Sequence, residues 1–147
     1  MSSQLRVPSR PGSVTGVAVL FVVGAVLQFI TAGLYAVLAI RPGEIQEFYG
    51  APISDWYWIL AAMLSGLLGF IYLWVARQQL AGDPQSWMLA NILMVINLFF
   101  ALFSLAYGTG CAVLALNAVA LVLNNTRAAR EYFGVGGPSD HLPPGAA

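Results

Sequence analysis

The chain has 147 residues, of which 59% are hydrophobic and 8% are charged. In ordinary soluble domains the charged share is about a quarter. The mean hydropathy is +0.78, and six basic residues balance six acidic ones, so the formal net charge is zero. This composition predicts one compact membrane domain. A neutral chain has no long-range field to attract DNA or RNA, so we expect no nucleic-acid partner.

The chain contains one cysteine, Cys111, and one histidine, His141. A single thiol forms neither an intramolecular disulfide nor a thiolate metal cluster. His141 lies among glycines and prolines near the C-terminus, so the apolar segments have no imidazole for haem ligation or proton transfer. These segments also lack a nucleophile with a basic partner and a pair of aspartates. We therefore expect no metal, no cofactor and no enzymatic activity.

Three uncharged stretches dominate the sequence, at 11–40, 56–76 and 84–126. A hydrocarbon core about 30 Å thick needs about 20 apolar residues for each helical crossing. The first two stretches therefore supply one span each and the third supplies two, with a turn at Tyr107-Gly108-Thr109-Gly110. The predicted spans cover about residues 14–40, 55–76, 84–106 and 110–126.

Local signals set the boundary between the second and third spans. We expect residues 77–79 to prolong the second helix into water, and Gly82 to cap its end. Asp83 followed by Pro84 predicts the start of the next helix, because the carboxylate caps free amides and the proline ring suits the first helical position. The two spans then form a tight antiparallel hairpin.

The fourth span is the shortest, with about 16 residues between Cys111 and Thr126, so tilt or local thinning of the bilayer must absorb the difference. We expect its helix to continue through residues 127–133, because Ala-Ala-Arg-Glu favours helix, and to end at Gly134.

The distribution of arginines predicts the orientation of the chain. Only Arg41 falls on one side of the four spans, and basic residues favour the cytoplasmic side of a membrane. The other side carries Arg6, Arg10, Arg77, Arg127 and Arg130. The predicted fold is therefore all-α, a transmembrane four-helix up-down bundle at residues 14–134 with both termini cytoplasmic. Residues 1–13 and 135–147 are expected to be disordered polar segments.

One polar side chain lies near the middle of each predicted span: Gln28, Ser65, Asn97 and Asn117. Each stands on a stripe of small or polar residues at helical spacing, facing a neighbouring helix. In lipid, small residues allow close approach and amides bond across the gap, which predicts an adhesive midplane layer. The alternative is that Gln28, Asn97 and Asn117 line a polar path for a small uncharged solute or an ion.

Arg127 and Arg130 follow the fourth span beside two aromatic residues, so they are candidate contacts for anionic lipid headgroups. Their alternative role is simply to anchor the helix end. The partners we expect are the lipid bilayer and either a second copy of the chain or another membrane protein.

Four features of the sequence carry a resemblance to known proteins. They are Gly-Ala-Val-Leu-Gln-Phe at 24–29, Gly82 in the hairpin, Asn-Leu-Phe-Phe-Ala-Leu-Phe-Ser-Leu at 97–105, and the ending from Leu123 to Gly134. Over about residues 14–134 the chain resembles a group of small, mostly uncharacterised four-span membrane proteins common in actinobacteria. The resemblance implies a four-span layout and brings no activity. Asp83-Pro84-Gln85 departs from the group, whose members are often more basic there.

The sequence therefore favours a non-enzymatic, multi-pass protein of the bacterial plasma membrane that acts as a structural or accessory partner through helix packing. The alternative is a small channel or carrier for an uncharged solute, which would use the midplane polar layer.

Overall fold

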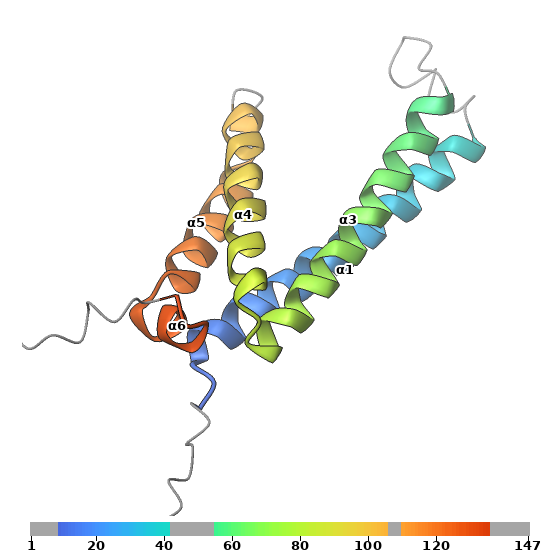
Figure 1. Cartoon of the computed structure of the whole chain (residues 1–147). Helices are drawn as coiled ribbons and strands as arrows, with labels where there is room; N and C mark the ends of the chain where they lie inside the picture. Colours follow the sequence, from blue (N-terminus) through green and yellow to red (C-terminus); the bar gives the residue numbers. More distant parts are fainter. Residues whose placement is uncertain (1–8, 42–54, 106–109, 136–147) are drawn as a thin grey trace, which may run out of the picture. The chain divides into compact units, whose positions relative to one another are not determined.

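A computed structural model describes residues 9–41, 55–105 and 110–135 of the chain. Within these ranges the regular structure is entirely helical, which confirms the all-α prediction. The helices are α1 (Gly12–Ile40), α3 (Asp55–Ala81), α4 (Pro84–Leu105), α5 (Cys111–Asn124) and α6 (Arg127–Tyr132), as drawn in Figure 1. The segments predicted to be disordered lie largely outside the described residues, at 1–8 and 136–147.

Three of the described helices are long and apolar enough to cross a membrane: α1, α3 from Trp56 onward, and α4. With 29, 26 and 22 residues at 1.5 Å rise, they reach about 43, 39 and 33 Å. In their most apolar 18-residue windows, only 22%, 28% and 17% of the residues are buried within the chain. Such extensive apolar exposure over these lengths indicates a multi-pass membrane protein.

The fourth apolar helix is shorter than the sequence predicts. α5 has 14 residues and is therefore about 21 Å long, less than the thickness of a hydrocarbon core. It begins at Cys111 and ends at Asn124, whereas the predicted span extends over 110–126. The four-span up-down topology stays a prediction.

The chain divides into two compact units, and the division falls within α1 and α3. The α1–α3 unit comprises Leu20–Ala76, and the α4–α5 unit comprises Met1–Val19 together with Arg77–Ala147.

In the α1–α3 unit, two long antiparallel helices lie side by side (Figure 1) and meet at glycines. A Cβ atom on Gly24 would lie 2.9 Å from the ring of Tyr72, and one on Gly69 would lie 2.9 Å from the ring of Phe29. The Tyr72 ring also packs edge-on against Phe21, with centroids 5.4 Å apart. The prediction that small residues in these helices allow close approach is confirmed at Gly24 and Gly69.

In the α4–α5 unit, α4 and α5 form an antiparallel hairpin. Gly110, at the start of α5, packs against Ala101 and Ser104 of α4, and the end of α5 returns to the level of Trp87. The backbone at Gly110 has φ +96°, in the left-handed region that glycine favours.

α3 ends in the turn that the sequence predicts. Gly82 has φ +77°, and its N–H donates to the carbonyl of Gln79 at 3.2 Å. The next N–H, that of Asp83, donates to the carbonyl of Gln78 at 3.2 Å. This pair of bonds is a Schellman motif, in which a left-handed residue satisfies the last carbonyls of a helix.

α4 also begins as predicted. Pro84 is its first residue, and Oδ1 of Asp83 accepts a hydrogen bond from the N–H of Gln85 at 3.0 Å. The carbonyl of Asp83 accepts from the N–H of Ser86 at 3.0 Å. The carboxylate therefore satisfies an amide that has no partner within the helix.

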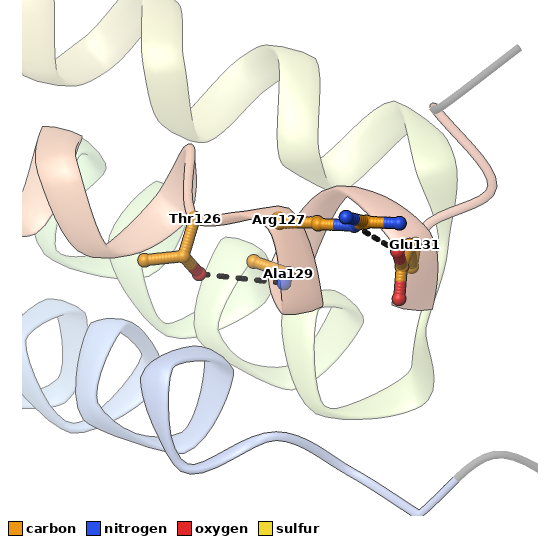
Figure 2. A network of polar contacts seen from close by, with 4 residues as sticks. All are labelled: Thr126, Arg127, Ala129 and Glu131. Atoms are coloured by element: carbon orange, nitrogen blue, oxygen red, sulfur yellow. Dashed lines mark hydrogen bonds and ion pairs between the residues drawn. The ribbon is translucent and has the colours of Figure 1, made fainter. Parts of the chain in front are cut away.

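The predicted continuous helix from the fourth span through residues 127–133 is wrong. The helix stops at Asn124, and α6 starts anew with Thr126 as its N-cap, at φ −61° and ψ 152°. Figure 2 shows the cap, in which the Thr126 hydroxyl accepts a hydrogen bond from the N–H of Ala129 at 3.4 Å. A threonine side chain that bonds to the backbone competes with helix, and here it outweighs the helix propensity of the alanines that follow. The predicted end at Gly134 is confirmed, with φ +66° and a second Schellman motif.

Candidate functional site

Several polar contacts of the described residues lie where helix ends meet in the α4–α5 unit. The start of α1, the last turn of α3, the first turn of α4, the end of α5 and α6 all contribute to this region. We call it the helix-end cluster and define it by Ser13, Val14, Gln79, Ser86, Trp87, Asn124, Thr126, Ala129 and Phe133.

Trp87 and Asn124 form the centre of the helix-end cluster. The indole Nε1 of Trp87 donates to the backbone carbonyl of Asn124 at 2.9 Å, and Nδ2 of Asn124 donates to the backbone carbonyl of Trp87 at 3.3 Å. The side chain of Asn124 is fully buried. The indole bond satisfies a carbonyl at the end of α5 that has no partner within its own helix. The pair therefore fixes the end of α5 against the first turn of α4.

Gln79 belongs to the same cluster, although the sequence predicts it in water beyond the second span. It is 0% exposed, and its Nε2 donates to the backbone carbonyl of Ser86 at 3.1 Å. That prediction is wrong for Gln79, because its side chain is buried against the first turn of α4.

Two buried acceptors in the cluster have no hydrogen-bond partner among the described residues. They are Oε1 of Gln79 and Oδ1 of Asn124, each the oxygen of an amide whose nitrogen is bonded. A buried oxygen without a donor lowers the stability of the fold by about 1–3 kcal/mol. The two oxygens are therefore places where a hydrogen-bond donor would stabilise the protein.

The N- and C-terminal parts of the described chain meet in the helix-end cluster. The hydroxyls of Thr126 and Ser13 hydrogen-bond at 3.1 Å. On the other side of α6, the Tyr132 hydroxyl donates to the backbone carbonyl of Leu80 at 3.3 Å. α6 thus bonds to both the start of α1 and the end of α3.

An apolar core lies beneath these hydrogen bonds. Val14 and Ala129 are fully buried, Phe133 is 2% exposed, and Trp87, Tyr132 and Val135 pack against them. The phenyl ring of Phe133 therefore packs within the protein. The charged residues of α6, by contrast, are exposed.

The polar face of α6 carries the two arginines predicted to contact headgroups, Arg127 and Arg130. Arg127 Nε donates to Glu131 Oε1 at 2.7 Å, an i,i+4 ion pair that Figure 2 shows along α6. The Arg127 side chain is 77% exposed, and Arg130 is also exposed. Both guanidinium groups lie on the surface, and their role toward lipid stays a prediction.

The predicted midplane layer is brought together only in part. Asn97 Nδ2 donates to Asn117 Oδ1 at 3.4 Å, which links the middle of α4 to the middle of α5. Asn117 Nδ2 also donates to the carbonyl of Val113 in its own helix at 2.8 Å. Gln28 and Ser65 belong to the α1–α3 unit, where Ser65 is buried and Gln28 half-buried. The layer as a whole stays a prediction.

Asn91 of α4, six residues before Asn97, has its hydrogen-bond partners within the chain. Asn125 Nδ2 donates to Asn91 Oδ1 at 2.7 Å, and Asn91 Nδ2 donates to the carbonyl of Trp87 at 3.0 Å. The amide of Asn91 therefore needs no contact with a second copy of the chain.

Sequence reasoning missed the helix-end cluster because its contacts join residues distant in sequence. Trp87 and Asn124 are separated by 37 positions, and nothing in the local pattern pairs them. One signal was present, since Gln79, Trp87 and Asn124 are hydrogen-bonding side chains at the ends of predicted apolar helices. Among residues 9–41, 55–105 and 110–135, no group of three His, Cys, Asp or Glu side chains could hold a metal ion.

No protein-family model matches the chain, and neither a curated protein nor a solved structure gives a significant match. The resemblance to actinobacterial four-span proteins therefore stays a prediction.

Proposed function

We propose that the protein is a non-enzymatic integral membrane protein that acts as a structural or accessory partner through helix packing. The observation that carries this proposal is the use of the polar side chains in the α4–α5 unit. The Asn97 amide bonds to Asn117, and the Trp87 indole bonds to Asn124, so both groups join one helix to the next. Ser104 donates to the carbonyl of Phe100 in its own helix. Polar groups committed in this way fix helix rotation and register.

The proposed topology is a four-span up-down bundle in the bacterial plasma membrane, with both termini cytoplasmic. The bond between Ser13 and Thr126 supports this topology, since an even number of crossings brings the two ends of the bundle to one side. The arginines at positions 77, 127 and 130 add to the support, because their places in the sequence put them on that side of the four predicted spans. The short α5 fits this scheme if the bilayer thins locally or the helix ends reach into the headgroups.

A flux experiment separates this proposal from the alternative of a channel or carrier for an uncharged solute. Purified protein is reconstituted in liposomes, and glycerol or urea entry is followed by stopped-flow light scattering. A packing partner leaves permeability at the level of protein-free liposomes. A carrier raises it, and the triple variant Gln28→Leu, Asn97→Leu and Asn117→Leu then abolishes the increase.

The same triple variant tests the adhesive role directly. Loss of the amide bonds is expected to lower the melting temperature in detergent or to change the oligomeric state, at about 0.6 kcal/mol for each bond. A matched control adds three leucines at exposed apolar positions, Met63→Leu, Val95→Leu and Val119→Leu, and should leave both properties unchanged. Solute flux in the wild type, or equal stability of the two triple variants, contradicts the proposal.

A homo-oligomer or a complex with another membrane protein is the proposed form of the partnership. Exposed apolar side chains cover most of α1, α3 and α4, which leaves ample surface for helix–helix contacts in lipid. Crosslinking in native membranes, followed by identification of the crosslinked chains, tests for this partner. A chain that crosslinks only to lipid contradicts it.

A further inference from the structure

The helix-end cluster contains two carboxamides in the same chemical situation. Gln79 of α3 and Asn124 of α5 are both 0% exposed. Their nitrogens donate to the carbonyls of Ser86 and Trp87, which are consecutive residues in the first turn of α4. Their oxygens, Oε1 and Oδ1, have no donor among the described residues. Two helices therefore each bring one buried carboxamide to a single turn of a third helix, with the nitrogen bonded to that turn and the oxygen without a donor.

Exchanging the oxygen and nitrogen positions of the two carboxamides does not give the buried oxygens a donor. The carbonyls of Ser86 and Trp87 accept hydrogen bonds and cannot donate them, so each must face the NH₂ group of its partner amide. The orientation of both carboxamides is therefore set by the backbone of α4, and both oxygens necessarily point to the other side. About nine in ten buried polar atoms in native proteins have a hydrogen-bond partner, and where the protein supplies none the partner is ordered water.

The chemistry of the two oxygens specifies the ligand. Both are neutral acceptors, so the ligand must donate hydrogen bonds. A cation would lose its hydration in a fully buried place without a neutralising charge, at a large cost, whereas a neutral donor avoids that cost. We propose that the helix-end cluster is a hydration site, in which buried water donates hydrogen bonds to Oε1 of Gln79 and Oδ1 of Asn124. The water completes the polar contacts of α3 and α5 with α4, and it does so whether the protein acts as a packing partner or as a carrier.

Nuclear magnetic resonance on the full chain tests the site without any substitution. The ¹⁵N-labelled protein in detergent micelles is examined for cross-peaks between water and the side-chain NH₂ protons of Gln79 and Asn124. Bound water gives cross-peaks of opposite sign in the laboratory and rotating frames, whereas proton exchange gives the same sign in both. The variants Gln79→Met and Asn124→Leu assign the two NH₂ signals by their loss.

Asn117 is the internal control for this measurement. Its Oδ1 already accepts a hydrogen bond from Asn97, so its NH₂ protons should show no bound-water cross-peak. Bound-water cross-peaks at both Gln79 and Asn124 support the hydration site. Their absence at either residue overturns it, as does a contact showing that another side chain of the protein donates to one of these oxygens.

Stability provides a second readout. Gln79→Met keeps the length of the side chain but removes the amide, so a hydrated site loses its water and the bond to Ser86, and the melting temperature falls by a few degrees. If the oxygen is instead bare, the apolar side chain relieves a penalty, and the melting temperature stays the same or rises. That second result overturns the proposal. Gln85→Met, at an exposed glutamine in the same turn of α4, is the matched control and should change nothing.

Discussion

The hydroxyl oxygens of Ser13 and Thr126 lie 3.1 Å apart across 113 positions of sequence. The bond joins the first turn of α1 to the N-cap of α6, and the buried contact of Val14 with Ala129 and Phe133 lies beside it. Such a contact is compatible with both ends of the helical domain on the same face of a membrane.

The first prediction follows from this contact and concerns topology. Reporter fusions at Met1 and Ala147 should report the same compartment, the cytoplasm, because the segments next to them meet at Ser13 and Thr126. Alkaline phosphatase and green fluorescent protein fusions measure this in bacterial cells. A fusion truncated after Arg41, beyond a single predicted span, should report the opposite compartment and serves as the control. Opposite compartments for the two termini contradict the proposed topology.

The second prediction concerns the indole of Trp87. Trp87→Phe keeps an aromatic ring but removes the donor to the Asn124 carbonyl, so the free energy of unfolding should fall by about 1–3 kcal/mol. Trp56→Phe is the control, because the Trp56 side chain is 76% exposed and its change should be close to zero. Denaturant unfolding in detergent micelles, followed by circular dichroism, measures both variants. Equal stabilities would show that the Trp87–Asn124 bond does not fix the end of α5.

The third prediction compares two glycines with positive φ. Gly110→Ala and Gly134→Ala both place a Cβ in the left-handed region, which costs about 1–2 kcal/mol. At Gly110 the new Cβ would also lie 2.7 Å from the Ala101 carbonyl oxygen, whereas at Gly134 nothing lies within 4 Å. Thermal unfolding should therefore show a clearly lower melting temperature for Gly110→Ala than for Gly134→Ala. The reverse order would mean that α5 does not pack against α4 at its start.

The fourth prediction concerns anionic lipid. Arg127→Gln and Arg130→Gln together should reduce the phosphatidylglycerol retained on purification, at about 1 kcal/mol for each basic residue. Native mass spectrometry of the purified protein counts the bound lipid molecules. Arg41→Gln, on the predicted opposite side, is the matched control. Unchanged retention in the double variant would leave the arginines as simple anchors of the helix end.

The helices and several of their ends were predictable because the responsible interactions are local. The lengths of the uncharged stretches are enough to locate α1, α3 and α4. The dipeptide Asp83-Pro84 locates the start of α4. Gly82 and Gly134 end their helices at the positions that their conformational freedom suggests. In each case the signal and the structure lie within a few residues of each other.

The break between α5 and α6 was not predictable from propensity. Thr126 caps α6, yet the residue three positions later is Ala129, so the acidic residue of a capping box is missing. The Thr126 hydroxyl also bonds to Ser13, a partner that lies 113 positions away in the sequence. Gln79 escaped prediction for a related reason, since its burial depends on the neighbouring helix and not on its own turn.

The glycosylation pattern Asn124-Asn125-Thr126 shows how context decides the meaning of a short motif. The Asn124 side chain is fully buried, and its Nδ2 donates to Trp87. A glycan on this nitrogen would require the end of α5 to leave α4. In this protein the asparagine of the motif therefore makes a packing contact between α5 and α4.

The contacts of α6 have a consequence for the order in which the protein is assembled. Val14 is covered by Ala129 and Phe133, which leave the ribosome only after more than a hundred further residues have been made. During synthesis the first turn of α1 therefore lacks its packing contacts with α6 until α6 has been made. Closure at this end therefore follows the synthesis of α6, and a nascent chain halted before residue 126 would keep it open.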